Sequence, residues 1–326
     1  MPRPDDFRIE TCALREPGPG EVVVENLMLS MDPAIRGFLD DREGYLPPAE
    51  VGDTVPGMAL GRVVQSRNPA LREGDLARGI SGWAEYVVFG DALGLEKVTP
   101  VPGVTLENYL GALGHTGLTA WVGLNEIGRI QPGDTVVVSA AAGATGSVAG
   151  QIARLQGCRV VGLAGSAQKV ARLRELGFDA AIDYRSVDDL GAAIREKCPD
   201  GVDVYFDNVG GPQLEALLPL MKLNGRIVAC GMVSSYNDQD HAYGVRTLWN
   251  TVLKRLTIRG FLLYDHFDRI PEAQAELTKW VISGQLVPLQ EVRDGLERAP
   301  EALIDLLSGR NLGKSVVRLS GAVTAA

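Results

Sequence analysis

The chain has few of the residues that bind metal ions. Its 326 residues include only three histidines and four cysteines, and no histidine is paired with a cysteine at ligand spacing. This scarcity excludes the Cys/His sets of zinc sites, so we expect no bound metal. The cysteines are also scattered, which predicts reduced thiols and hence a cytoplasmic protein. They are Cys12, Cys158, Cys198 and Cys230.

Positive charge and long apolar runs are also lacking. The chain has 32 lysines and arginines against 41 acidic residues, a net charge of −9. Nucleic-acid binding needs a basic face, so this balance argues against such a partner. No apolar run reaches the roughly 18 residues of a membrane span, and no basic start is followed by an apolar signal segment. We therefore expect a small-molecule partner, with neither nucleic acid nor membrane.

Glycine, in contrast, is abundant at 39 residues, and one glycine-rich segment is the most informative part of the chain. An apolar β-branched run from Thr135 leads into very small residues and then into an apolar-periodic helix. The junction holds Gly143, Ala144, Thr145 and Gly146. A helix N-terminus has unpaired N–H groups and a positive dipole, which suits a pyrophosphate. The glycine pattern alone is a weak signal, because it is shorter than the full Gly-x-Gly-x-x-Gly.

Strands and helices alternate after this loop. The expected strands are 159–164, 180–183, 202–207 and 226–230, and the expected helices are 168–176, 188–197 and 213–221. This alternation predicts right-handed βαβ units and a parallel, doubly wound sheet. Similar turns occur in α/β domains that bind no dinucleotide, but several consecutive units favour a dinucleotide-binding domain of the Rossmann type.

The end of the second strand favours NADPH over NADH. An NAD site carries a carboxylate about 20 residues after the glycine loop, to hold the ribose 2′-hydroxyl. Residues 162–169 contain no acid, and Ser166 and Lys169 instead offer a hydroxyl and a cation to a 2′-phosphate. Tyr184 and Arg185 follow the third strand. The alternative for Lys169 is an ordinary solvated helix residue.

The segments outside this series have a different character. Residues up to about 110 are rich in Gly and Pro, with β-prone runs at 21–29, 60–64 and 84–88. They predict a mostly antiparallel, barrel-like domain. Helices are expected at 271–283 and 300–307, and a strand at 314–319. We expect residues 1–113 and 285–326 to form the substrate domain, with the NADP-binding domain, 114–284, inserted between them.

Six motifs in order resemble the medium-chain dehydrogenase/reductase superfamily, in the zinc-independent branch of prostaglandin reductases, alkenal double-bond reductases and bacterial curcumin reductase. The resemblance covers nearly the whole chain. It rests on Leu-Ser-Met-Asp-Pro at 29–33 with Arg36-Gly37, the segments 117–123 and 140–146, Phe-Asp-Asn-Val-Gly-Gly at 206–211, the segment 230–237, and Asn-Leu-Gly-Lys at 311–314. It implies a Rossmann-type sheet domain inserted into a mostly antiparallel, GroES-like catalytic domain.

The resemblance also assigns roles to residues. Gly143–Gly146 match the pyrophosphate contact, and Lys169 and Tyr184, with Gly165 and Ser166 beside them, match the 2′-phosphate site. The rest of the cofactor, including its nicotinamide end, would be lined by further positions. These are Asn208, Cys230, Gly231, Met232, Val233, Ser234, Ser235, Tyr236, Phe261, Leu262, Leu263 and Asn311.

The chain departs from the family pattern at two places. Ala34 stands where relatives commonly have an aromatic residue, which implies a roomier substrate pocket. The stretch before Phe7 is also shorter than usual, so either the first strand is missing or the true start lies upstream of Met1.

Without zinc, the resemblance implies reduction of an activated C=C bond. Hydride reaches the β-carbon of an enal or enone, and hydrogen-bond donors can hold the resulting enolate. The candidate donors are the Tyr236 hydroxyl and the cofactor's ribose 2′-hydroxyl. Tyr45 matches a substrate-pocket tyrosine of some relatives, although it could equally be a loop aromatic packed on its own turn. For Trp83 and His115 we favour structural roles.

Two other functions stay open at this point. One is quinone reduction by the same hydride, and the other is an NADPH-binding protein with little turnover that acts structurally or as a sensor. Relatives are commonly dimers joined through the edges of their dinucleotide-domain sheets. The β-prone run 256–261 is suited to such an edge strand, so we expect a homodimer.

Overall fold

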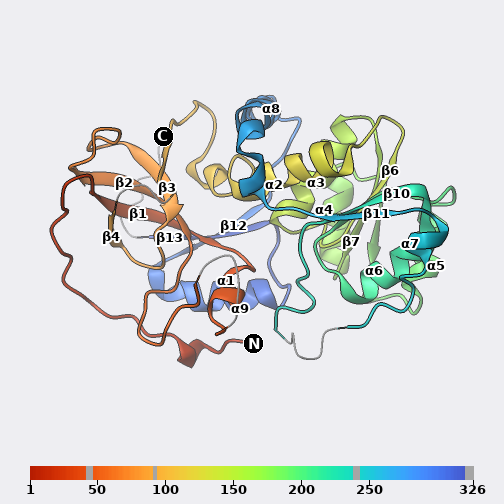
Figure 1. Ribbon diagram of the computed structural model, residues 1–326, viewed down its shortest axis with the longest axis horizontal. Coiled ribbons are helices and arrows are strands. Elements are labelled where there is room, and N and C mark those ends of the chain that lie inside the picture. The colour runs from red at the N-terminus through yellow and green to blue at the C-terminus, as the bar shows by residue number, and fades with distance from the viewer. Residues whose placement is uncertain (42–46, 91–93, 238–242, 320–326) are drawn as a thin grey trace. The chain divides into compact units, whose positions relative to one another are not determined.

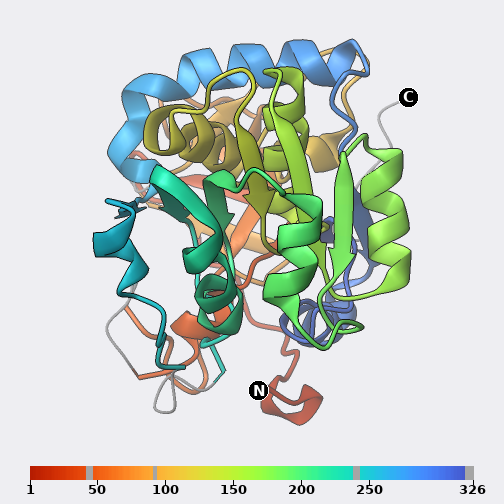
Figure 2. The same ribbon diagram turned by 90° about the vertical axis from the view of Figure 1, so that its right-hand side faces the viewer.

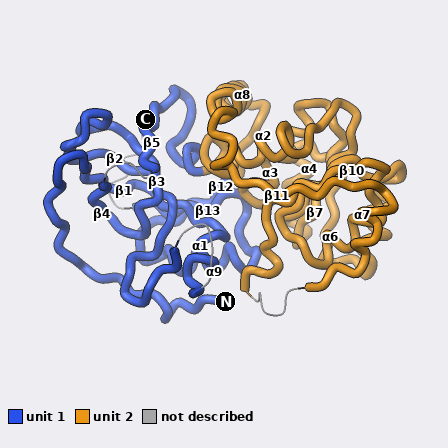
Figure 3. The backbone as a smooth tube through the Cα atoms, viewed as in Figure 1, with its two compact units in different colours: residues 1–110, 290–326 blue, residues 111–289 orange. Residues whose placement is uncertain are grey.

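The computed structural model describes residues 1–41, 47–90, 94–237 and 243–319. The chain forms two compact units, which Figure 3 colours separately. Unit 1 comprises residues 1–110 and 290–326, and unit 2 comprises residues 111–289. Each unit is described by itself below.

Unit 2 is built on a six-stranded sheet in which all neighbouring strands are parallel (Figures 1 and 2). The strand order is β11-β10-β9-β6-β7-β8. The strands are β6 (Thr135–Val138), β7 (Arg159–Ala164), β8 (Ala180–Asp183), β9 (Val202–Asp207), β10 (Met221–Ala229) and β11 (Thr257–Gly260). This confirms the doubly wound parallel sheet predicted from the sequence.

Helices cover both faces of the sheet. The crossover helices are α3 (Ala144–Leu155), α4 (Ala167–Glu175), α5 (Leu190–Lys197) and α6 (Gly211–Leu217). Ile194 of α5 and Leu217 of α6 join one buried cluster with Val137 and Tyr205 of the strands. On the other face, α3 packs closely against the segment that precedes β8, because a Cβ on Gly150 would lie 1.9 Å from the Phe178 ring. Strands buried on both faces explain the continuous apolar runs in the sequence.

The other α-helices in the described part of unit 2 lie outside the crossovers. They are α2 (His115–Val122), which continues in wider turns over Gly123–Gly128, α7 (Asn250–Leu253) and α8 (Ile270–Ile282). Two glycines of the segment 117–123 are required by packing: a Cβ on Gly117 would lie 1.9 Å from the Ala112 carbonyl oxygen, and one on Gly123 would lie 2.6 Å from the Phe206 ring.

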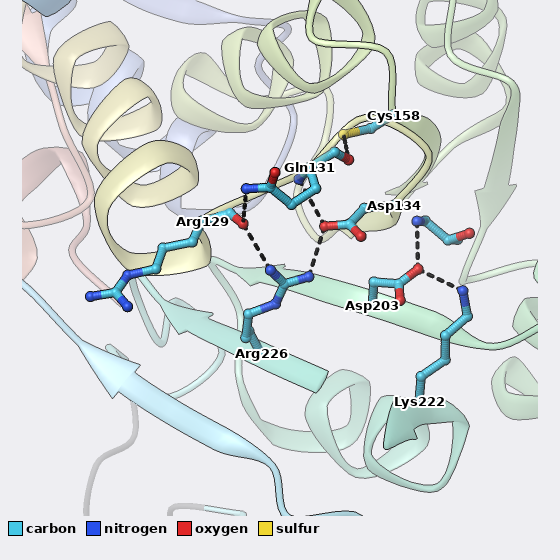
Figure 4. A network of polar contacts seen from close by, with 8 residues as sticks. Arg129, Gln131, Asp134, Cys158, Asp203, Lys222 and Arg226 are labelled. Atoms are coloured by element: carbon cyan, nitrogen blue, oxygen red, sulfur yellow. Dashed lines mark hydrogen bonds and ion pairs between the residues drawn. The ribbon is translucent and has the colours of Figure 1, made fainter. Parts of the chain in front are cut away.

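A polar network joins the amino ends of the central strands of unit 2 (Figure 4). The Arg226 guanidinium donates to Asp134 Oδ2 at 2.7 Å and to the Arg129 carbonyl oxygen at 2.8 Å. Lys222 pairs with Asp203 at 2.7 Å, and Asp203 also accepts from the Thr135 backbone N–H. This network fixes the end of the sheet at which the strands begin. The loops considered below lie at the opposite end, where the strands finish, which we call the carboxyl edge.

Unit 1 contains a seven-stranded, mostly antiparallel sheet of order β12-β13-β1-β2-β3-β5, with β4 pairing to β1. Among the described strands of unit 1, only β12 and β13 pair in parallel. The strands are β1 (Val22–Met31), β2 (Met58–Ser66), β3 (Leu76–Ile80), β4 (Tyr86–Phe89), β5 (Glu96–Val98), β12 (Gln290–Asp294) and β13 (Lys314–Arg318). The mostly antiparallel domain is therefore confirmed.

The described part of unit 1 contains two α-helices, α1 (Ile35–Phe38) and α9 (Ala299–Leu307). Ala299, Ala302 and Leu303 of α9 pack against Leu29 of β1 and Val317 of β13, so the C-terminal segment completes the core of this unit. None of the helices in the described part of the chain combines the length and apolar character that a membrane span requires.

Candidate cofactor site

The loops at the carboxyl edge of the parallel sheet hold nearly all the predicted cofactor residues. Ligands of open α/β sheets bind at this edge. Gly143–Gly146 follow β6, Gly165 and Ser166 follow β7, and Tyr184 follows β8. Asn208 follows β9, residues 230–236 follow β10, and residues 261–263 follow β11. The structure therefore brings these positions to one side of unit 2.

The glycine loop after β6 fits a pyrophosphate. Gly143 is the N-cap of α3 and no side chain caps this helix end, so its first N–H groups can face an anion. A Cβ on Gly146 would lie 2.4 Å from the Ala140 carbonyl oxygen, so only glycine allows this tight turn. Ala140 has a φ of 45°, a strained value for a residue with a side chain. The turn therefore ends at a helix N-terminus that no side chain caps.

A buried polar network behind this edge was not predicted from the sequence. Asp207 Oδ1 accepts hydrogen bonds from Tyr205 Oη at 2.8 Å, Ser139 Oγ at 3.1 Å and the backbone N–H groups of Val209 and Gly210 at 3.0 and 2.8 Å. Burial raises the pKa of Asp207, and these donors oppose the shift. One carboxyl group thus anchors the loop after β9.

Ser139 connects this hydrogen-bond network to Asn208. Its Oγ accepts from the Asn208 backbone N–H at 2.8 Å, and its carbonyl oxygen accepts from Asn208 Nδ2 at 2.7 Å. Both bonds tie the loop after β9 to the end of β6. The side-chain amide of Asn208 is thereby held in one orientation at the carboxyl edge.

The loop after β10 is bonded to the loop after β9. Val233 N donates to the Asn208 carbonyl oxygen, and both the N–H and the hydroxyl of Ser234 donate to the Val209 carbonyl oxygen. Burial raises the pKa of Cys230 to about 12, with the Asp207 charge contributing. Cys230 therefore stays a neutral thiol, unsuited to act as a nucleophile.

The hydroxyl of Tyr236 reaches back to the start of its own loop. Tyr236 Oη accepts from the Met232 backbone N–H at 3.4 Å, and a Cβ on Gly231 would lie 3.3 Å from the same oxygen. The candidate catalytic hydroxyl therefore sits at the carboxyl end of β10, among the predicted cofactor residues.

The loops after β7 and β8 contact each other. Ser166 caps α4 by accepting from the Lys169 backbone N–H at 3.3 Å. The Tyr184 backbone N–H donates to the Ala164 carbonyl oxygen at 3.0 Å. All four positions expected to hold a 2′-phosphate are thus close in the structure.

The segment after β11 is rich in aromatic rings. The Phe261 and His266 rings lie 6.4 Å apart, and a Cβ on Gly123 would lie 3.0 Å from the Phe261 ring. His115 of α2 contacts Tyr264 with ring centroids 5.6 Å apart. Leu263 is buried, whereas Leu262 is exposed.

Other sequence-predicted residues lie elsewhere. Asn311 belongs to unit 1, where it is buried and donates to the Gly313 carbonyl oxygen at 2.9 Å. Tyr45 lies outside the described residues. Trp83 stacks on Phe7 with ring centroids 5.5 Å apart, at the margin of a core cluster. In the described residues no three His, Cys, Asp or Glu side chains gather as a metal site would require.

The comparison with known proteins identifies the family. The chain is 41% identical to the NADPH-dependent curcumin reductase of Escherichia coli, over 98% of this chain and 94% of that protein. It is 41% identical, with the same coverage, to the NADP-dependent 2-alkenal reductase of Nicotiana tabacum, and 39% identical to prostaglandin reductase 1 of Mus musculus, over 98% and 95%. The chain belongs to the medium-chain dehydrogenase/reductase superfamily.

Its place is in the branch of these three reductases. Residues 1–98 match the family model described as the N-terminal domain of oxidoreductase, and residues 144–279 match the one described as zinc-binding dehydrogenase. Two crystal structures of CurA from Vibrio vulnificus, one of them in complex with NADPH, share 34% identity with TM-scores of 0.91. They cover 99% and 98% of this chain, and 96% of CurA is covered.

Proposed function

We propose that this protein is an NADPH-dependent reductase that saturates the activated C=C bond of α,β-unsaturated aldehydes and ketones. The observation that carries the proposal is the position of three groups at the carboxyl ends of the strands of one parallel sheet. They are the uncapped glycine loop at 143–146, Ser166 with Lys169, and the Tyr236 hydroxyl. The names of the curcumin, alkenal and prostaglandin reductase relatives support this substrate class.

We assign the different parts of the cofactor and the substrate to different residues of this chain. When bound, NADPH supplies a hydride to the β-carbon of the substrate. The first N–H groups of α3 would hold the pyrophosphate, and Lys169 with Ser166 would hold the 2′-phosphate. Asn208, fixed by Ser139, would orient the nicotinamide end. Tyr236 would donate a hydrogen bond to the substrate oxygen, where negative charge develops as the enolate forms.

The role of Tyr236 can be separated from a packing role. Its hydroxyl accepts a long hydrogen bond from the Met232 N–H at 3.4 Å, and phenylalanine keeps the ring, so we expect Tyr236→Phe to fold normally and to bind NADPH with little change. The variant should lower kcat on an enone about 10-fold or more, since one oxyanion donor is worth about 10²–10³ in rate and the ribose hydroxyl shares the charge. Tyr86→Phe, at an exposed tyrosine of β4, is the control. An unchanged kcat would remove Tyr236 from the mechanism.

We propose further that catalysis is independent of zinc. Tyr236 and the cofactor's ribose hydroxyl would hold the enolate charge that a Lewis acid would otherwise stabilise. Treatment with a chelator should leave the rate unchanged, and metal analysis should find no stoichiometric zinc. Activity that disappears with the chelator and returns with zinc would overturn this proposal.

We also propose a homodimer that forms through β11. This strand is at the edge of the sheet and all four of its residues are exposed. The apolar side chains of Trp249, Val252 and Leu253, in and beside α7, are exposed as well. Light scattering should give the mass of two chains, and Ile258→Asp should give one, because a charge would enter the paired edge. Ile282→Asp, at an exposed position of α8, should remain dimeric.

The cellular location proposed is the cytoplasm, because the four cysteines are free thiols. Fractionation of the native host should recover the protein with the cytoplasmic enzymes, and recovery with a secreted fraction would contradict the assignment.

Turnover of a substrate panel tests the function itself. Enals, enones and quinones are assayed with purified protein by the loss of NADPH absorbance, and kcat/KM is compared. We expect enals and enones to exceed quinones. Preference for quinones would favour the quinone reductase alternative, and NADPH binding without turnover of any class would favour the sensor or structural alternative.

A further inference from the structure

Two side chains from the turn after β8 reach the carboxyl end of β7. A Cβ added to Gly165 would lie 3.0 Å from Tyr184 Oη and 3.2 Å from Arg185 Nε. Both side chains therefore occupy the space that the missing side chain of Gly165 leaves open. The turn at Gly165 follows β7 directly, and the adenosine ribose of a dinucleotide binds at this point in a sheet of this type.

The guanidinium of Arg185 has no acidic partner in the described part of the chain. Arg185 is exposed, and its guanidinium carbon lies 5.7 Å from the centroid of the Tyr184 ring. Its backbone N–H donates to Asp183 Oδ1 at 3.1 Å. Arg172 of the neighbouring α4, in contrast, pairs with Glu175. The Tyr184 ring thus supports a guanidinium whose donors are not used by a carboxylate.

Ser166 and Lys169 directly follow Gly165 in the chain. Lys169 is in the first turn of α4, and Ser166 caps that helix. A hydroxyl, an ammonium group and a guanidinium thus come from the neighbouring turns after β7 and β8. Residues 162–169 contain no acid, and the nearby Asp183 carboxylate accepts the Arg185 backbone N–H. This is the chemistry of a phosphate monoester site.

We propose that Arg185 is a second specificity-determining cation for the 2′-phosphate of NADPH, in addition to Lys169. A guanidinium is a planar fork that can donate two parallel hydrogen bonds to phosphate oxygens while its face stays on an aromatic ring. Tyr184 holds the guanidinium in place for this contact. The proposal rests on the cofactor site proposed above and adds a residue that the family resemblance did not assign.

Dissociation constants for NADPH and NADH test the proposal. They are measured by fluorescence titration for the unmodified protein, Arg185→Ala, Arg185→Lys and Lys169→Ala. Losing a charge-assisted contact should raise the Kd of NADPH about 10–100-fold in Arg185→Ala and leave that of NADH unchanged. Arg185→Lys should keep part of the affinity. Arg174→Ala, at an exposed arginine near the other end of α4, is the matched control and should bind like the unmodified protein.

The outcomes separate this proposal from the site on which it rests. Equal weakening of NADPH and NADH in Arg185→Ala would mean that the side chain stacks on adenine, and would overturn the proposal. So would an unchanged NADPH affinity in Arg185→Ala when Lys169→Ala loses NADPH selectively. If neither variant changes the ratio of the two constants, the proposed cofactor site is itself wrong.

Discussion

Replacing Ser139 with alanine should destabilise unit 2 and weaken cofactor binding together. Ser139 is fully buried, and its hydroxyl joins the ends of β6 and β9. The substitution removes the donor to Asp207 Oδ1 and the acceptor of the Asn208 N–H. A buried donor left without a partner costs about 1–3 kcal/mol, and a typical hydrogen bond contributes about 1 kcal/mol more. We therefore expect a loss of about 2–4 kcal/mol in the free energy of unfolding.

Urea titration followed by tryptophan fluorescence measures this loss, and an NADPH titration measures the second effect. The Kd of NADPH should rise several-fold, because the loop that carries Asn208 loses one of its two bonds to Ser139. The matched control is Ser147→Ala. Ser147 is equally buried, but its hydroxyl makes only a 3.4 Å bond to the Ala144 carbonyl oxygen, so it should lose less than about 1 kcal/mol.

Equal losses of stability in the two serine variants would refute the reasoning, because they would show that burial alone sets the cost. An Ser139→Ala variant as stable as the unmodified protein would refute it too. A loss of stability with an unchanged Kd would show that the network supports the fold but does not position Asn208.

Two further predictions concern the ion pairs. Hydrogen bonding to Arg246 lowers the pKa of Glu215 from its ordinary value of 4.5 to about 2, so this pair stabilises the fold above pH 4.5 and its contribution disappears as the pH falls toward 2. The thermal midpoint of Glu215→Gln should therefore fall less between pH 5 and 2 than that of the unmodified protein, and parallel curves would contradict this. Lys314 is buried and pairs with Asp32 at 2.6 Å. Urea titration of Lys314→Met should therefore show a free energy of unfolding lower by about 2 kcal/mol. This is less than the loss for a fully buried pair, because Asp32 is partly hydrated. An unchanged midpoint would show that this pair does not hold β13 to β1.

The sequence predicted the parallel sheet well because its strands are buried on both faces. The run at 159–164 is β-branched and apolar, is bounded by a glycine and a helix cap, and forms β7 with the same bounds. The edge position of β11 was also anticipated. Strands of unit 1 such as β5 and β12 were missed, because they are short and rich in charged residues, so their pairing depends on neighbours far away in the sequence.

The candidate site was predictable where glycine or a helix start gave a local signal. Gly143–Gly146 and Ser166 are of this kind. The roles of Ser139, Asp207 and Arg185 depend on contacts between loops that follow different strands, and no spacing in the sequence reveals them. Asp207 stands inside the recognised segment 206–211, but its four hydrogen bonds to one oxygen appear only when β6 and β9 are adjacent.

The position of a transferred deuterium tests the central proposal most directly. The protein is given NADPH deuterated at the reactive C4 position and a simple enone, and the product is examined by NMR. The proposed function predicts a saturated ketone with deuterium at the β-carbon. Deuterium on a carbinol carbon, as in an allylic alcohol, or no reduced product at all, would contradict it.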